Sequence, residues 1–158
     1  MRTTRICAAA AALLLAGGLS GCGLTIPIDP DGTLESVRGA ELRVGFSADP
    51  GLIADDGGGG PDGSLPELVT GFADTVDADV DWTEGSEETL VGMLERGDLD
   101  LVVGGMTDRS PWLDRAGMTR GYPEIEGAHG RPIVMLVPLG ENGFLTALET
   151  YLDEEVGS

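Results

Sequence analysis

Strand and helix patterns alternate along residues 42–103, and this order restricts the chain to few folds. Residues 42–49 alternate apolar and polar side chains before Pro50-Gly51, which is typical of a β-strand that ends at a turn. The apolar run 101–103 precedes two glycines, and a strand of this kind is expected to be covered on both faces of a parallel sheet. The order β-α-β-α-β predicts an α/β fold, a single small three-layer lobe with a mainly parallel sheet.

The two segments between these strands are predicted to be helices that face the sheet. In residues 64–76 apolar side chains recur at spacings of three and four, and Ser64 with Glu67 is typical of a capping box. The second helix is expected to begin at Ser86, because two glutamates follow that match the helix dipole. Gly97 is expected to end it.

Two further strands are predicted, around residues 80–82 and over the apolar run 133–137. Between them, residues 112–121 are short and mixed and are expected to form an irregular helical turn. Asn142 is expected to cap the last helix. The acidic end of that helix, residues 153–155, opposes the helix dipole and is expected to fray.

The N-terminal segment has the three parts of a secretory signal: two arginines, an apolar run of Ala and Leu, and small residues. It ends in Leu-Ser-Gly-Cys at residues 19–22, which resembles the bacterial lipobox, where the cysteine sulfur receives diacylglycerol. A plain signal peptide with a chance cysteine is the alternative. We expect a signal peptide over residues 1–21, the lipidated Cys22 with a flexible tether over residues 22–40, and the lobe over residues 41–158. The lobe would then be lipid-anchored at the extracytoplasmic face of the cell membrane.

Composition excludes several classes of function. The chain has 28 Asp and Glu against 9 Arg and no Lys, and its net charge of −19 repels phosphate, so nucleic acid is not an expected partner. With one histidine, His129, and two cysteines, a zinc site or a Ser-His-Asp triad is disfavoured. We expect no enzyme and no cofactor. Asp55, Asp56 and Asp62 in a Gly-rich loop could gather a hard cation, but a solvated loop is the preferred interpretation.

Two motifs resemble the bacterial extracellular solute-binding proteins (family 3) of polar amino-acid ABC importers. The first, residues 42–50, reads Leu-Arg-Val-Gly-Phe-Ser-Ala-Asp-Pro. The second, residues 99–107, reads Leu-Asp-Leu-Val-Val-Gly-Gly-Met-Thr. Proteins of this family have two α/β lobes that close on a ligand and deliver it to a membrane permease. The resemblance covers residues 41–122 and implies the first lobe of a type II periplasmic-binding-protein-like fold.

The resemblance also implies that the second lobe is missing. Only 36 residues follow Tyr122, and residues 134–142 are similar to the strand and turn by which the family returns from the second lobe. Because closure needs two lobes, a ligand would bind one open face. We therefore expect an affinity no better than roughly micromolar, unless a partner supplies the second wall.

The residues that the resemblance suggests for the ligand follow the first and third strands and the next turn: Ser47, Asp49, Gly105, Thr107, Arg109 and Trp112. An alignment to the family without gaps places Arg109 at the position of a Thr and Trp112 at the position of an Arg. In the family these two residues commonly bind the carboxylate of an amino acid. Arg109 or Arg115 could replace this clamp, or both could be solvated surface residues. Trp112 could pack or could face the ligand. At the position where the family has an aromatic residue that stacks on the ligand, this chain has Leu52 or Ile53, so that ring is missing.

Two classes of function follow. The first is an extracytoplasmic lipoprotein that binds a small polar or cationic solute for transport, since the negative charge favours cations. The second is a docking module that has lost ligand binding and contacts a membrane transporter permease or sensor. A solute-binding protein should gather polar groups around Ser47 and Thr107, whereas a docking module should expose a contiguous apolar patch.

Overall fold

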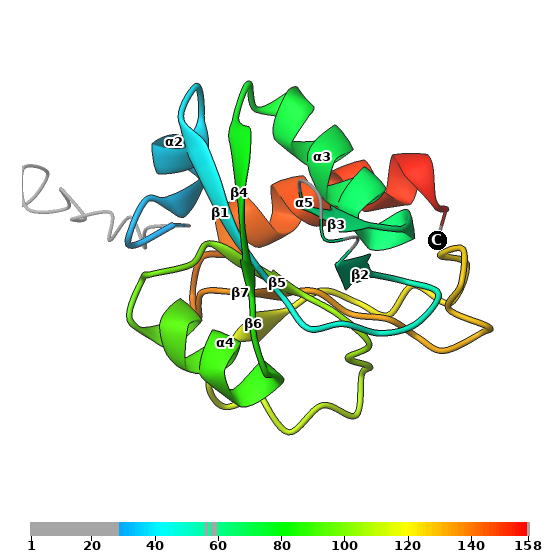
Figure 1. Cartoon of the computed structure of the whole chain (residues 1–158). Helices are drawn as coiled ribbons and strands as arrows, with labels where there is room; N and C mark the ends of the chain where they lie inside the picture. Colours follow the sequence, from blue (N-terminus) through cyan, green and yellow to red (C-terminus); the bar gives the residue numbers. More distant parts are fainter. Residues whose placement is uncertain (1–28, 56, 58–59, 158) are drawn as a thin grey trace, which may run out of the picture.

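A five-stranded sheet with helices on both faces forms the centre of the protein in the computed structural model (Figure 1), which describes residues 29–55, 57 and 60–157. The strand order is β4 (Asp79–Glu84), β1 (Glu41–Phe46), β5 (Leu101–Val103), β7 (Leu136–Val137) and β6 (Gly117–Met118). The first three strands are parallel, and β7 and β6 are antiparallel to their neighbours. The predicted α/β class with a mainly parallel sheet is confirmed. Cys22 and the predicted signal peptide lie outside the described residues.

Two hydrophobic cores lie on opposite faces of the sheet. The larger core contains side chains of α2 (Thr33–Val37), α3 (Ser64–Thr75) and α5 (Asn142–Glu155), and the smaller one those of α4 (Glu87–Glu95). Successive residues of β5 alternate between them: Leu101 and Val103 belong to the larger core and Val102 to the smaller. The central strand is therefore buried on both faces, as predicted, and the lobe has three layers.

The predicted tether is wrong over residues 33–37, which form α2. Val37 is 1% exposed in the larger core, so this segment is part of the folded lobe. Two backbone N–H groups at its start, those of Asp31 and Thr33, donate to the buried Glu141 carboxylate at 2.8 Å each. The helix start is stabilised by a carboxylate more than a hundred residues away, which no local pattern indicates.

The first turn of α3 differs from the predicted capping box. Gly63 precedes the helix with φ +130°, and a Cβ there would lie 2.4 Å from the Leu52 carbonyl oxygen. Ser64 is the first helical residue, and its hydroxyl donates to the Glu126 carbonyl at 2.6 Å instead of accepting a helix N–H. The tertiary contact replaces the local cap. Ser86, in contrast, lies at the predicted start of α4, and it caps the helix by accepting from the Thr89 N–H.

Asn142 is likewise not the cap of the last helix. It is the first residue of α5, and its side-chain N–H donates to the Gly140 carbonyl at 3.1 Å. The Asp29 carboxylate takes the capping role from a distance, since it accepts from the N–H of Phe144 at 3.0 Å and from that of Leu34 at 2.9 Å. One carboxylate therefore joins the N-terminal turns of α5 and α2.

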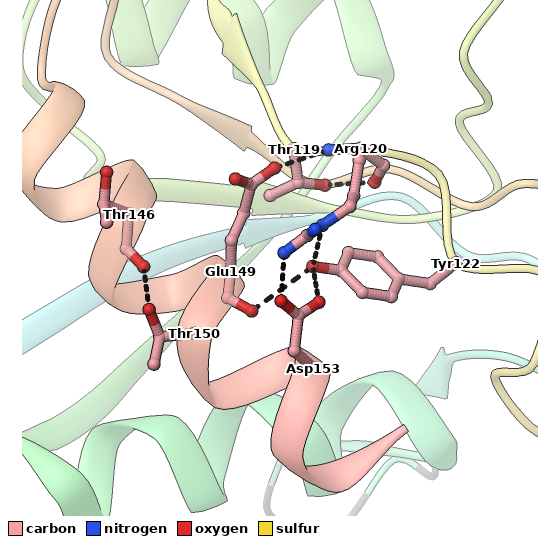
Figure 2. A network of polar contacts seen from close by, with 7 residues as sticks. All are labelled: Thr119, Arg120, Tyr122, Thr146, Glu149, Thr150 and Asp153. Atoms are coloured by element: carbon pink, nitrogen blue, oxygen red, sulfur yellow. Dashed lines mark hydrogen bonds and ion pairs between the residues drawn. The ribbon is translucent and has the colours of Figure 1, made fainter. Parts of the chain in front are cut away.

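A polar network holds the other end of α5, and the predicted fraying is wrong there (Figure 2). The Tyr122 hydroxyl donates to Asp153 at 3.1 Å and accepts from the Arg120 Nε–H at 3.1 Å. Arg120 also pairs with Asp153, and its backbone N–H donates to Glu149 at 2.7 Å. Burial is the main cause that raises the pKa of Tyr122 to about 12. The network connects α5 to the chain that leaves β6.

Two other segments differ in detail from their prediction. Residues 111–115 form turns and are followed by β6, so the irregular helical turn does not extend to residue 121. The Gly-rich loop is closed by a short antiparallel pair, β2 (Ala54–Asp55) with β3 (Pro61–Asp62).

In the part of the chain that the structure describes, no helix is both long enough and apolar enough to cross a membrane.

Candidate functional site

The carboxyl ends of β1 and β5 meet at one edge of the sheet and bring three of the candidate residues together. The Ser47 N–H donates to the Val103 carbonyl at 3.0 Å, which continues the pairing of the two strands. At Gly105 a Cβ would lie 1.9 Å from Asp49 Oδ2, so only a glycine leaves room for the carboxylate. The structure thus places Ser47, Asp49 and Gly105 side by side, because parallel strands end at a common edge.

The Asp49 carboxylate binds the guanidinium of Arg131, a residue that the sequence analysis did not single out. Arg131 donates through both terminal nitrogens, at 2.8 and 3.0 Å, in a bidentate ion pair. These hydrogen bonds stabilise the charged carboxylate and are the main cause that lowers the pKa of Asp49. The Asp49 side chain is 22% exposed, so the pair lies at the surface of the site and not in the core.

Arg131 lies in what we call the return segment, residues 123–132, which connects Tyr122 to Ile133. Two of its side chains, Ile125 and Ala128, belong to the larger core. At Gly127, with φ +82°, a Cβ would lie 1.9 Å from the Gly51 carbonyl oxygen, so the two backbones are in close contact. The return segment is therefore packed directly against the turn that follows Asp49.

A hollow of about 340 Å³ separates the end of the return segment from the turn after β5, and its lining consists of Thr107, Asp108, Arg109, Gly130, Arg131 and Pro132. Thr107 is paired with Ile133 in an isolated antiparallel bridge, which fixes the two walls relative to each other. The Thr107 hydroxyl accepts from the Arg109 backbone N–H at 3.4 Å. Two of the candidate residues, Thr107 and Arg109, therefore face the same hollow as Arg131.

Arg109 differs from the other arginines of the described residues. Six of the seven form ion pairs with a carboxylate: Arg38, Arg43, Arg96, Arg115, Arg120 and Arg131. Within the described part of the chain, no carboxylate oxygen lies within 4.0 Å of the Arg109 guanidinium, and the side chain is exposed. Among the described residues, a guanidinium without a carboxylate partner is notable in a chain with 28 acidic residues.

The remaining candidates have structural contacts. Arg115 donates to the Glu95 carboxylate at 2.9 and 2.5 Å and lies over the Trp112 ring at 5.4 Å, so it is not available as a carboxylate clamp. Trp112 packs on the smaller core and donates to Glu87 at 3.1 Å, which favours packing over ligand contact. Leu52 and Ile53, at the position of the family's aromatic, are both in the larger core.

The Gly-rich loop shows no cation site in its described residues. Asp55 accepts from the Gly57 N–H at 2.8 Å, and Asp56 lies outside the residues that the structure describes. Across residues 29–55, 57 and 60–157, no group of three His, Cys, Asp or Glu side chains is arranged to hold a metal ion.

Comparison with known proteins yields matches among solved structures only. No family model and no curated protein matches the chain. Domain 1 of TmArgBP in its arginine-bound form is 21% identical with a TM-score of 0.66, and 77% of this chain matches 97% of that one (a Phe57Trp variant). An arginine-specific periplasmic binding protein of Salmonella typhimurium is 10% identical with a TM-score of 0.63, over 75% of this chain and 94% of that one.

An ancestral arginine-binding protein bound to arginine gives a similar match, with 15% identity, a TM-score of 0.62 and coverage of 75% of this chain and 92% of that one. At such identities the likeness concerns the fold. The described residues have the fold of a single lobe of periplasmic-binding-protein-like domains, as the sequence motifs implied.

Proposed function

We propose that the protein is a membrane-anchored extracytoplasmic lipoprotein that binds a small polar or cationic solute and is associated with transport. The observation that carries the proposal is the convergence of Ser47, Asp49, Gly105 and Thr107 at the carboxyl edge of a lobe with this fold. The arginine-bound domain 1 of TmArgBP supports the idea that one lobe suffices to hold a solute. The net charge of −19 favours a solute with a positive group.

A non-binding docking module for a transporter or sensor is the alternative. Such a module needs a contiguous apolar surface, and the described residues expose two large hydrophobic side chains, Leu113 at 59% and Leu139 at 60%. The gathered polar groups at the carboxyl edge favour solute binding. The transporter permease then remains the natural partner, because a solute held at the membrane surface must be passed on.

Titration calorimetry of the full-length protein in detergent, with L-arginine, L-lysine, L-histidine and L-glutamine, tests solute binding. We expect micromolar to millimolar affinity that falls with added salt, because the attraction is partly electrostatic. The variant Gly105→Ala should abolish binding, since its Cβ displaces the Asp49 carboxylate. Gly92→Ala on α4 is the matched control, because a Cβ there meets only the flexible end of Arg96 at 3.4 Å. Absence of heat with every solute up to millimolar concentration would contradict the proposal.

The lipid anchor rests on the sequence at residues 19–22. Cells grown with a fatty-acid analogue should incorporate the label through Cys22, and Cys22→Ala should remove it. Cys7→Ala is the control, because the cysteine within the apolar run should not affect labelling. Unlabelled wild-type protein would exclude the anchor and leave the binding site untouched.

A further inference from the structure

We propose that a membrane protein docks on the edge of the sheet at which the parallel strands begin, which we call the amino edge. The docking surface is the hollow that contains Asp31, Asp114 and Leu139. Its partner is an extracytoplasmic segment that offers arginine or lysine beside apolar side chains. The inference rests on the proposed function, because it takes the lipidated Cys22 as the point of attachment to the membrane.

The chain between Cys22 and the folded lobe is short. The Asp29 carboxylate accepts from the N–H groups of Leu34 and Phe144, so the lobe includes Asp29. Asp29 follows Cys22 by seven residues, and covalent geometry limits the distance between them to roughly 25 Å. The lobe is therefore held closer to its anchor than a tether over residues 22–40 would allow.

The position of Asp29 decides which edge of the lobe lies near the membrane. Helix α2 lies beside the start of β1 (Figure 1), so Asp29 is at the amino edge. A lobe of this length is about 35 Å across. If its carboxyl edge rested on the bilayer, Asp29 would be about 35 Å away, which is beyond the reach of the chain. The amino edge is therefore the nearer one, and the solute site faces away from the membrane.

Two exposed leucines mark a contact surface at the amino edge. Leu139 lines the hollow of about 470 Å³ and is 60% exposed, and Leu113, which is 59% exposed, directly precedes Asp114 in its lining. These are the two exposed large hydrophobic side chains of the described residues. Glu141, two residues after Leu139, accepts from the Asp31 N–H at 2.8 Å. The leucine-bearing surface is thus fixed next to the part of the lobe that leads to the anchor.

The hollow carries an excess of negative charge. Its two arginines, Arg43 and Arg115, are each paired with a carboxylate. Asp31 and Asp114 are exposed, and in the described part of the chain their carboxylates form no ion pair. These two charges beside two leucines complement a segment with basic and apolar side chains. An anionic bilayer surface would be repelled by the same charges.

The surface is small, and the anchor makes a small surface sufficient. Small interfaces are typical of transient complexes. A lobe anchored in the same membrane as its partner meets that partner at a high effective concentration, so a weak contact is enough to hold it. Docking at the amino edge also leaves the carboxyl edge open, so that docking and solute binding do not compete.

Energy transfer from a dye on the lobe to an acceptor on lipid headgroups tests the orientation. The full-length lipidated protein is placed in vesicles of phosphatidylethanolamine and phosphatidylglycerol. The dye is attached to Leu139→Cys or to Glu84→Cys, an exposed position at the carboxyl end of β4. The two natural cysteines, Cys7 and Cys22, lie outside the lobe.

Transfer from residue 139 should be at least about twofold higher than from residue 84, because the two edges are about 35 Å apart. Equal transfer from the two positions, or more from residue 84, overturns the orientation. A dye at residue 139 that reports insertion into the lipid of these protein-free vesicles identifies the bilayer as the occupant and overturns the protein partner.

Photocrosslinking in native membranes tests the partner. A benzophenone on Leu139→Cys should give an adduct with an integral membrane protein, and one on Glu84→Cys should not. The double reversal Asp31→Lys with Asp114→Lys should reduce the adduct at least about fivefold, because attraction becomes repulsion. The absence of an adduct from residue 139, or an adduct that the reversal does not change, overturns the docking surface.

The double variant Asp74→Lys with Glu154→Lys is the matched control. Both residues are exposed on other helices, α3 and α5, and the change in net charge is the same. This control should keep the adduct. If it loses the adduct equally, the total charge of the lobe governs the contact and the proposed surface is overturned.

The proposed function is measured separately in the same proteins. Calorimetry with L-arginine, L-lysine, L-histidine and L-glutamine should give equal solute binding in the two double variants, since neither changes the carboxyl edge. Solute binding without the docking contact overturns this inference alone. A wild-type protein that docks but binds none of these solutes contradicts the proposed solute binding and supports the docking surface. Wild-type protein without a fatty-acid label on Cys22 contradicts the anchor and this inference together.

Discussion

Two hollows lie at opposite edges of the parallel strands, and they differ in what their arginines bind. The hollow at the amino edge, about 470 Å³, contains Arg43 and Arg115, and both are paired, with Asp100 and Glu95. The hollow at the carboxyl edge contains Arg131, which is paired, and Arg109, which has no carboxylate partner among the described residues. The hollow at the amino edge is the larger of these two, but the arginine without a carboxylate partner lies at the carboxyl edge, which agrees with the site proposed there.

Three carboxylates at or near the amino edge accept hydrogen bonds from the backbone. Asp29 and Glu141 accept from N–H groups at the starts of α2 and α5, and Asp100 accepts from the Arg43 backbone N–H at 2.9 Å. A charge whose partners are backbone groups stabilises the fold and leaves nothing for a ligand. At the carboxyl edge the Asp49 carboxylate pairs with the Arg131 side chain, and among the described residues no carboxylate lies within 4.0 Å of the Arg109 guanidinium. The comparison predicts that changes at the amino edge affect stability, and that changes at the carboxyl edge affect binding.

The largest expected loss of stability is that of Glu141→Ala. The substitution leaves two backbone N–H groups without their acceptor, one of them buried, and should lower the free energy of unfolding by about 3 kcal/mol. Urea unfolding followed by circular dichroism measures it. Glu154→Ala, at an exposed position of α5, is the control and should change little. If Glu141→Ala instead impairs solute binding at unchanged stability, the division between the two edges is wrong.

The strands of the sheet could be predicted because their signals are local. The apolar run of β5 is continuous since both faces are buried, and β1 alternates before a Pro-Gly turn. The helix starts could not be predicted equally well. Ser64 and Asn142 have the residue types of a cap, but the caps come from Gly63 and from the distant Asp29. A sequence pattern does not show a tertiary hydrogen bond that outcompetes a local one.

The same distinction applies to the candidate site. Ser47, Asp49 and Gly105 could be placed together from the sequence, because parallel strands end at one edge. Arg131 could not, since it reaches Asp49 across 82 residues through an irregular segment without periodicity. The sequence gives a partial indication that Arg131 has a role. The chain has only 9 arginines, and this one lies between Gly130 and Pro132, in a segment with turn-forming residues.

Tyr122→Phe tests whether the polar network that precedes the return segment contributes to stability only and leaves solute binding unchanged. The hydroxyl bonds to Arg120 and Asp153 are lost, so the free energy of unfolding should fall by about 1 kcal/mol at pH 8, with solute binding unchanged. The folded-state pKa of Tyr122 is raised to about 12 from an ordinary 10.0, so its contribution is complete below pH 10 and is lost as pH rises toward 12.

The advantage of the wild type over Tyr122→Phe should therefore narrow between pH 10 and 12 in urea titrations. The raised pKa of Tyr151, caused mainly by burial, contributes equally to both proteins and cancels in the difference. A difference that stays constant over this range would show that the Tyr122 hydroxyl is not protected from ionisation in the folded state.

The smallest loss of stability is expected for Asp49→Asn, because the ion pair with Arg131 is partly exposed and water screens it. The pKa of Asp49 is lowered below its ordinary value of 3.8 by the Arg131 hydrogen bonds, so its contribution is complete above that value and is lost as pH falls through the lowered pKa. Thermal melts at pH 7 and pH 2.5 should thus show a small difference from the wild type that shrinks in acid. Asp81→Asn, exposed on β4, serves as the control. The same variant removes the ion pair at the centre of the proposed site, so solute binding should weaken far more than the stability. If Asp49→Asn destabilises the lobe as much as Glu141→Ala does, the carboxyl edge is structural like the amino edge, and the contrast between them fails.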